Sequence, residues 1–381
     1  MTKSNHVGRT SWPRQPTTYE RYMNEQGVPV HRPGFGVRDL RELPLGGWDR
    51  LGARGAFVEL EGLLGFQGIH LLEVSSGVRT RPERHLFEEI ALVLEGRGTL
   101  HVGAAPEALG DAVSWQPGSV MTIPLNAWHA FESSGEPSLI LFTSNAPLIM
   151  QLFQSRTEFV FDNPWAFTDR YTPNSGFFDP VELTTDPDSG RAVYAGGFLP
   201  DATSLELPFD GQRGEGYRHV ELFMRGTFSN GFVAEYPQGG YSKTHSHGSG
   251  PVLICLKGSG YTLAWPRGAG TRPWESGQED QIVRVNYEAG GLVSAAPGGG
   301  DWFHAHFGAS PTPMRVLAHL GSTPLRVAGK PGDVFVDTNQ DIRDGGATIG
   351  YADEDPMVRR LFEEELNKHD VAFGMPDHIY E

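Results

Sequence analysis

The sequence predicts an all-β fold built from two similar halves, with helices only near the two ends of the chain. Three observations lead to this prediction. Short apolar or alternating runs recur between turn residues in both halves. The 381 residues include 49 glycines and 28 prolines, which suits short strands joined by loops and argues against a helix bundle. A histidine-centred pattern also occurs twice, once around His85 and again around His247.

The two halves and their flanks divide the chain into five predicted segments. The linker between the halves holds many aromatic residues, so we expect it to pack on the barrels rather than to remain in water. The predicted segments are an N-terminal arm (1–36), a first barrel (37–150), a packed linker (151–208), a second barrel (209–335) and a C-terminal extension (336–381).

One helix is expected in each terminal segment. The first would span about residues 18–26, because Thr17 and Glu20 fit a capping box and Gly27 offers a stop. The second would begin after the capping residue Asp355, with a proline in its first turn. Its buried face would consist of Val358, Leu361, Phe362 and Leu366.

Strand patterns fill the two halves. The runs are short, and glycine or proline turns separate them, which favours an antiparallel sandwich or barrel. In the first half a turn is expected at Glu95-Gly96, and in the second half the strand at 252–256 ends at a Gly-Ser-Gly turn. The strands expected in the first half are 69–74, 90–94, 99–102, 119–123 and 139–143.

Charge and cysteine content limit the partners and the compartment. The net charge of −16 argues against nucleic acid and anionic membranes as partners. The single cysteine, Cys255, excludes an internal disulfide and suits a reducing cytoplasm. The sequence contains no apolar run of membrane-spanning length and no visible signal peptide. We expect a cytoplasmic protein that forms a homodimer or a higher homo-oligomer.

Two H-x-H pairs suggest a metal site in the second half. His245 and His247 precede the apolar strand at 252–256, and His304 and His306 follow in GGGDWFHAHFG. Residues i and i+2 of a strand point to the same face, so both imidazoles of a pair can reach one point. Imidazole is a frequent transition-metal ligand, and the pattern therefore predicts a metal site built on β-strands.

The first half repeats this arrangement with changes. One constant offset aligns His85 with His247 and Gly96 with Gly258. A second motif ends at His129 in the first half and at His304 in the second. The second half has more residues between its two motifs, and the stretch 266–291 is the expected insertion. An internal duplication with one lengthened loop accounts for the pattern.

These motifs resemble those of bicupins, which consist of two tandem cupin barrels (double-stranded β-helix or jelly-roll domains). The cupin motifs have the forms G-x5-H-x-H-x3,4-E-x6-G and G-x5-P-x-G-x2-H-x3-N. The departures are Glu83 and Asn126 in the first half, and Pro251 and Gly308 in the second. The matching residues are His85, Glu89, Gly96, Gly118, Pro124 and His129, and then Gly239, His245, His247, Gly258 and His304.

The resemblance implies that His245, His247 and His304 hold a divalent metal. An all-imidazole set suits Fe²⁺, Ni²⁺, Cu²⁺ or Zn²⁺, whereas a carboxylate ligand favours Mn²⁺. Three-histidine cupins are similar to gentisate 1,2-dioxygenase-like iron enzymes. The leading hypothesis is therefore an Fe(II)-dependent dioxygenase that uses O₂ to cleave or oxidise a small aromatic or enolisable oxygenated acid.

Further residues of the second half are candidates for this site. His306 follows His304 by two residues and is interpreted as an acid/base or hydrogen-bonding helper, with a core role as the alternative. Tyr241 and Trp302 are expected to form walls of the pocket. Lys243 either pairs with a substrate carboxylate or lies in solvent at the start of its strand.

The first barrel supports two readings. His85, Glu89 and His129 match a facial triad of two histidines and one carboxylate. Alternatively, the site has decayed, and its polar residues hydrogen-bond one another or pair with Arg81 or Arg84; these residues are Glu83, His85, Glu89 and His129. The resemblance favours decay. Other functions stay open, namely a Mn- or Zn-dependent decarboxylase, lyase or isomerase, and a non-catalytic binding protein.

Overall fold

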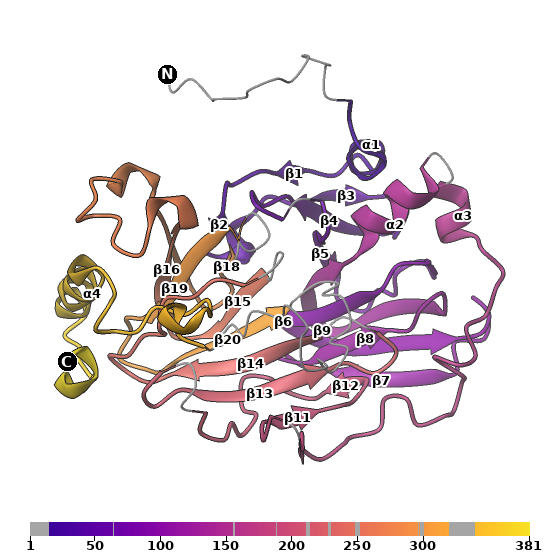
Figure 1. Ribbon diagram of the computed structural model, residues 1–381. Coiled ribbons are helices and arrows are strands. Elements are labelled where there is room, and N and C mark those ends of the chain that lie inside the picture. Colours follow the sequence, from indigo (N-terminus) through magenta and orange to yellow (C-terminus); the bar gives the residue numbers. More distant parts are fainter. Residues whose placement is uncertain are drawn as a thin grey trace.

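The computed structural model describes residues 15–63, 65–154, 157–187, 189–210, 214–227, 230–247, 252–295, 297, 301–319 and 340–381. It consists mainly of β-strands in two barrel-like units, with short helices at the periphery (Figure 1). The predicted boundary between residues 335 and 336 lies outside the described residues. No helix of the described part is long and apolar enough to cross a lipid bilayer.

The first barrel is built around two long strands, β6 (Glu89–Gly103) and β9 (Trp128–Ser144), which pair along nearly their whole length. Within the described residues they belong to a nine-stranded sheet. Its other strands are β1 (Val30–His31), β3 (Gly46–Trp48), β4 (Ala53–Val58), β5 (Gly68–Val74), β7 (Asp111–Trp115), β8 (Val120–Ile123) and β12 (Phe198–Leu199).

The prediction of a turn at Glu95-Gly96 is wrong. Strand β6 continues through these residues, and the register with β9 shifts on both sides of Glu95. Gly96 has φ of +82°, and a Cβ at this position would lie 2.6 Å from the backbone of Ser138. The glycine therefore allows a bulge and a close approach of β9 rather than a chain reversal.

The second barrel divides its strands between two sheets. An eight-stranded sheet and a three-stranded sheet are present among the described residues. The larger sheet contains β2 (Gly36–Val37), β10 (Thr184–Thr185), β11 (Ala192–Tyr194), β13 (Arg218–Phe223), β14 (Asn230–Tyr236), β15 (Val252–Lys257), β18 (Leu292–Ser294) and β20 (Met314–His319). The smaller sheet contains β16 (Ser259–Pro266), β17 (Val283–Glu288) and β19 (Trp302–Gly308).

Strand register supports the predicted duplication. At the offset that aligns His85 with His247, β6 coincides with β15 and β16 together, and Gly96 with Gly258, which separates these two strands. In the first barrel Val102 pairs with His129, and in the second barrel Ala264 pairs with His304. The connection between β16 and β17 spans residues 267–282, whereas that between β6 and β7 spans 104–110. The lengthened loop therefore lies within the predicted insertion.

The arm and the linker both tie the barrels together. Strand β1 joins the first barrel beside β4, while β2 joins the second barrel beside β18. Within the linker, β12 pairs with β8 and β11 pairs with β13. Apolar residues of the two large sheets form one shared core, including Ile69, Leu71, Ile90, Val220, Ile254 and Leu317. Tandem barrels with an arm and a C-terminal helix confirm the predicted bicupin fold.

The helices begin as the capping residues predict. Helix α1 (Thr18–Glu25) has a complete capping box of Thr17 and Glu20, and α4 (Pro356–Lys368) follows Asp355. The prediction that helices occur only near the two ends of the chain is wrong, because α3 (Thr157–Phe161) lies within the linker and α2 (Ala146–Phe153) begins just before it. Short 3₁₀ helices occur at Leu40–Glu42, Arg267–Ala269, Glu279–Gln281, Ile342–Asp344 and Asp377–Tyr380.

Replacement of Asp355 by alanine should destabilise the C-terminal extension. The Asp355 carboxylate is fully buried and accepts hydrogen bonds from the backbone N–H groups of Met357, Trp274 and Glu275 at 2.8–3.0 Å. Loss of an N-cap alone costs about 1 kcal/mol, and two further buried donors would lose their partner. We expect the free energy of unfolding to fall by about 2 kcal/mol or more in urea denaturation. A change below about 0.5 kcal/mol, the range of neutral surface substitutions, would contradict this.

Candidate metal centres

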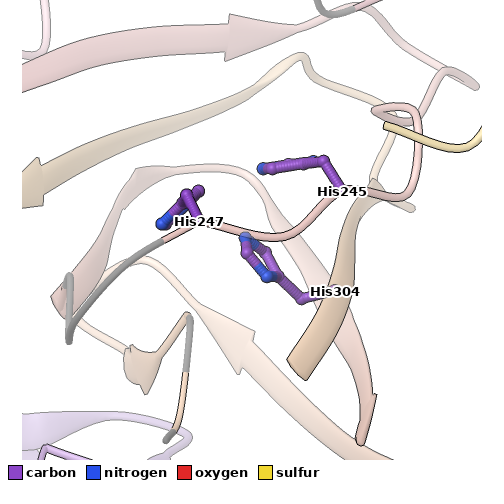
Figure 2. Close-up of side chains that lie close together, drawn as sticks. All are labelled: His245, His247 and His304. Carbon is purple, nitrogen blue, oxygen red and sulfur yellow. The ribbon is translucent and has the colours of Figure 1, made fainter. Parts of the chain in front are cut away.

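Three imidazoles of the second barrel come together beside the start of β15. His245 and His247 lie on the segment that precedes this strand, and His304 lies on β19 (Figure 2). One nitrogen of each ring lies within 4.8 Å of the corresponding nitrogens of the other two. His304 is completely buried and His245 is 5% exposed. The structure thus brings together all three residues that the resemblance assigned to a metal.

Backbone pairing fixes this centre from both sides. His245 and His304 exchange two backbone hydrogen bonds, of 2.9 and 2.8 Å. On the other side, Ser246 donates to the carbonyl of Ala347 and Ile349 donates to that of Thr244. The C-terminal extension therefore holds the ligand segment in place. No pattern in the sequence predicted that the C-terminal extension would support the ligand segment.

The tautomer of His245 is also fixed. Its Nδ1 lies 2.7 Å from the carbonyl oxygen of Lys243, and a carbonyl only accepts hydrogen bonds, so Nδ1 carries the proton. In the neutral ring Nε2 then carries the lone pair, as a metal ligand requires. This is the usual arrangement around metal-bound histidine, and the donor set fits a divalent transition metal.

The first barrel holds a second triad, and its donor atoms meet the same distance limit. The donor atoms of His85, Glu89 and His129 all lie within 4.8 Å of one another, and the three residues are only 1–3% exposed. The Nε2 of His85 is 3.3 Å from Oε2 of Glu89. Geometry alone therefore gives no sign that this site has decayed.

Both histidines of this triad are oriented for ligation. The Nδ1 of His85 donates to the carbonyl of Phe87 at 2.9 Å, and that of His129 donates to the carbonyl of Ala127 at 3.1 Å. The Nε2 atoms of both rings are buried and make no hydrogen bond within the described residues. Buried acceptors without a partner are costly, so two converging lone pairs beside a carboxylate fit a cation.

Glu83 occupies the position of His245 in the first barrel. It exchanges backbone hydrogen bonds with His129, just as His245 does with His304. The expected pairing of Glu83 with Arg81 or Arg84 is wrong, because Glu83 Oε2 lies 2.5 Å from Nη1 of Arg50. Burial, the largest single effect, would raise the pKa of the Glu83 carboxyl, but Arg50, His129 and His85 together outweigh burial and hold this pKa well below its usual range.

The other two arginines have different contacts. The Arg81 guanidinium donates to the carbonyl of Asp49. Arg84 donates to the carbonyl of Asp162 at 3.1 Å, and its guanidinium lies 4.8 Å from the centre of a Trp128 ring. Arg50 precedes Glu83 by a long stretch of sequence, so no local pattern could have pointed to it.

A cavity of about 400 Å³ opens beside this first centre. Its walls come from α1, α3 and the loops that carry Glu83 and Arg84. A second, smaller cavity lies further in and is lined by Glu89 and His70. Three side chains line both cavities, namely Tyr22, Arg50 and Glu83. These three residues therefore separate the mouth from the interior of the first barrel.

His306 lies near the second centre but outside its ligand group. Its Nδ1 is 2.8 Å from the hydroxyl oxygen of Thr262, which is 3.0 Å from the hydroxyl of Tyr287. Its ring centre is 5.3 Å from that of His304. Trp302 lies on the same face of β19 and packs on Phe35 at 5.5 Å. The helper role of His306 and the wall role of Trp302 remain proposals.

The prediction that Tyr241 forms a wall of the pocket does not agree with the position of its side chain. Its ring stacks on Phe307 and packs on Phe362 of α4, on the opposite face of β19 from the metal centre. Backbone bridges join Tyr241 to Phe307 and His245 to His304, so four residue steps on one segment oppose three on the other. This irregular register reverses the face that simple alternation predicts. Trp265 also faces away from the centre, against Phe303.

Tyr241 instead belongs to a buried polar cluster of the C-terminal extension. It donates to Oε1 of Glu354, and Tyr380 donates to Tyr241. Burial raises the pKa of the Glu354 carboxyl to about 8, so the folded state binds a proton that the unfolded chain releases near pH 4.5. The resulting stabilisation is complete below about pH 4.5 and is lost as the pH rises towards 8.

The matched test compares the native chain with Glu354→Gln. We expect the free energy of unfolding of the native chain to decrease between pH 5 and 8, and Glu354→Gln to remove most of this decrease because the amide does not titrate. Urea denaturation at several pH values measures both. Parallel pH profiles of the two proteins would contradict the assignment.

Comparisons with known proteins bear on the fold. No known protein family matches the sequence, and no curated protein does. Similar solved structures include a deletion mutant of Bacillus subtilis oxalate decarboxylase, with 12% identity, a TM-score of 0.46 and coverage of 75% of this chain and 76% of that one. A second structure of the same enzyme, from work on its Mn(II) centres, has 13% identity, a TM-score of 0.47 and coverage of 75% of this chain and 77% of that one. At these values function has to be argued from the site itself.

Proposed function

We propose that this bicupin-fold chain is a divalent-metal-dependent enzyme that converts a small carboxylic acid without net oxidation, as a decarboxylase, lyase or isomerase, at the centre of the first barrel. The observation that carries the proposal is the buried triad of His85, Glu89 and His129 beside a mouth that ends on Arg50 and Glu83. The two imidazoles and one carboxylate suit Mn²⁺, with Fe²⁺ and Zn²⁺ as alternatives. When bound, the metal would act as a Lewis acid towards substrate oxygens.

Arg50 is positioned to receive the acid. Both acidic side chains and Arg84 line the mouth, whereas Arg50 lines the mouth and the smaller cavity alike and pairs with Glu83. A substrate carboxylate that exchanges with Glu83 would form a charge-assisted pair with the guanidinium. Arg50 would thereby orient the acid towards the triad.

Glu83 is positioned to handle a proton. Its Oε1 lies 3.7 Å from Nε2 of His129, so the carboxylate borders the centre without belonging to the triad. Once released from Arg50, it would accept a proton from the substrate and return it to the product, which leaves no net proton change. Tyr22 and Phe161, which line the mouth, would limit access of water.

The test is turnover without oxygen. Mn²⁺-reconstituted protein would be incubated under argon with a panel of small mono- and dicarboxylic acids, and products would be followed by NMR and CO₂ capture. We expect turnover that His85→Ala abolishes and that His247→Ala, its counterpart in the second barrel, leaves largely intact. Turnover that requires O₂, or that survives His85→Ala, would refute the proposal.

A second candidate is the Fe(II)-dependent dioxygenase, with the second centre as its site. The all-imidazole set of His245, His247 and His304 favours it, and the hydrogen-bonded pair of His306 and Thr262 offers a proton-transfer group nearby. An oxygen electrode would test Fe(II)-loaded protein with catechols, gentisate, salicylates and diketones. Oxygen uptake lost in His247→Ala but kept in His85→Ala would favour this candidate.

The lone cysteine bears on the compartment. Cys255 is 1% exposed, and burial raises the pKa of its thiol to about 12. A chain without a disulfide needs no oxidising environment. A cytoplasmic location therefore remains our proposal.

A further inference from the structure

Helix α2 presents an unusual surface. A helix that borders solvent normally carries charged residues on its outer face, as α4 does with the exposed pair Arg360 and Glu364. The sequence of α2, APLIMQLF, contains no charged residue. Leu148 is nevertheless 39% exposed and Leu152 is 70% exposed. Exposed apolar side chains that gather on one surface often mark a site of protein–protein contact.

An apolar groove lies beside α2, and Phe153 of this helix lines it. It has a volume of about 520 Å³ and is lined mainly by aromatic and aliphatic side chains between α2, α3 and the segment after α3. Trp165 is 68% exposed and Phe159 is 43% exposed. No lining residue in the described part of the chain carries a charge; residues 155 and 156, between the helices, lie outside it. We call the surface formed by Leu148, Leu152, Phe159 and Trp165 the α2–α3 face.

We propose that the α2–α3 face binds a second copy of this chain and forms an isologous homodimer. Each chain has a net charge of −16, so two copies repel each other over most orientations. A two-fold axis places a patch against itself, which brings like charges together wherever the patch carries a single sign of charge. The uncharged α2–α3 face avoids this repulsion and buries apolar area in return. Trp165 would be the central anchor, because exposed tryptophan often dominates interface energies.

The same segment is firmly attached to the first barrel. Leu86 donates its backbone N–H to the carbonyl of Val160 at 2.9 Å, and Asn126 donates to the carbonyls of Asn163 and Trp165 at 2.9 and 2.6 Å. A partner would therefore meet a preformed surface, which lowers the entropy cost of association. This inference does not depend on the proposed function.

Sedimentation velocity over a concentration series tests the proposal. We expect a dimer for the native chain, and dissociation constants at least about 30-fold weaker for Leu152→Glu and Trp165→Glu. Phe209→Glu is the matched control, since Phe209 is 62% exposed and lies outside the α2–α3 face; it should leave the dimer intact. A monomer at every concentration would overturn the proposal, as would a dimer that neither variant weakens.

Cross-linking tests the location of the interface directly, without a variant that weakens the dimer. The native thiol of Cys255 is buried, so Leu152→Cys introduces an accessible one on the α2–α3 face. A bismaleimide should then produce a covalent dimer, whereas Phe209→Cys should not. A dimeric protein that cross-links only through the control position would place the interface elsewhere and overturn the proposal. A native monomer that dimerises only after removal of residues 2–14 would assign the face to the N-terminal segment and also overturn it.

Discussion

His129→Ala should remove metal from the first barrel while leaving the second barrel loaded. The imidazole supplies one of three donor atoms that lie within 4.8 Å of one another, and loss of a mere outer-sphere partner already costs about 10- to 100-fold in affinity or activity. We therefore expect more than a 100-fold loss of metal affinity at this centre. Metal analysis of the purified variants should show one equivalent less than the native chain.

The duplicated barrel supplies the matched variant. His304→Ala removes the residue that corresponds to His129 in strand register and should deplete the other equivalent. His101→Ala is the control, because His101 pairs with Glu132 outside both centres, and it should retain all metal. If His129→Ala kept its full metal content while His304→Ala lost all of it, the second barrel alone would bind metal, as the resemblance first implied.

Both candidate centres could be located from the sequence because their motifs resemble those of bicupins and because a duplication preserves spacing. The constant offset between the halves aligns Glu83 with His245, and the backbone bridges of both residues to the second-motif histidines bear out that alignment. Motif spacing reports strand register wherever pairing is regular. The residues of both triads could therefore be named from the motifs and their resemblance to those of bicupins, and the structure brings each triad together.

Other features could not be predicted, for physical reasons that differ. The face of Tyr241 depends on an irregular register, and a single extra residue reverses every later side chain. Helices α2 and α3 are short and rich in aromatic and aliphatic residues. Such short apolar runs do not distinguish helix from strand by periodicity, so Asn145 and the proline in the first turn of α2 were not enough to predict the helix. The partner of Glu83 depended on the fold, because Arg50 reaches it from a distant loop after β3.

Arg50→Met should destabilise the fold more than loss of an ordinary surface ion pair. The pair of Arg50 and Glu83 is largely covered, with side-chain exposures of 29% and 18%, and the guanidinium also lies 3.9 Å from the centre of the Phe161 ring. Removing one partner of a fully buried pair costs about 3–5 kcal/mol because the other charge is left without compensation. Partial exposure reduces the expected loss in the free energy of unfolding to about 2–3 kcal/mol.

The acid limb of the stability profile should change in the same variant. Arg50, together with His129 and His85, outweighs burial and holds the pKa of Glu83 below its unfolded value. Glu83 therefore contributes stability at pH values above the unfolded pKa and loses it as the pH falls through the folded pKa. Arg50→Met should remove the share of this contribution that the guanidinium supplies. The native chain should therefore lose its advantage over the variant on acidification, and a constant difference down to acid unfolding would contradict this account.

A double-mutant cycle measures the interaction energy between Arg50 and Glu83 apart from their contacts with other residues. Glu83→Gln keeps the shape of the side chain without its charge, and Arg50→Met keeps most of the apolar stem that packs on Phe161. Because the double variant carries no uncompensated charge, we expect it to be more stable than Arg50→Met alone. Urea denaturation of the four proteins gives the coupling energy. A value below about 0.5 kcal/mol would mean that water screens the pair, and Arg50 would then be free to meet a carboxylate without first leaving Glu83.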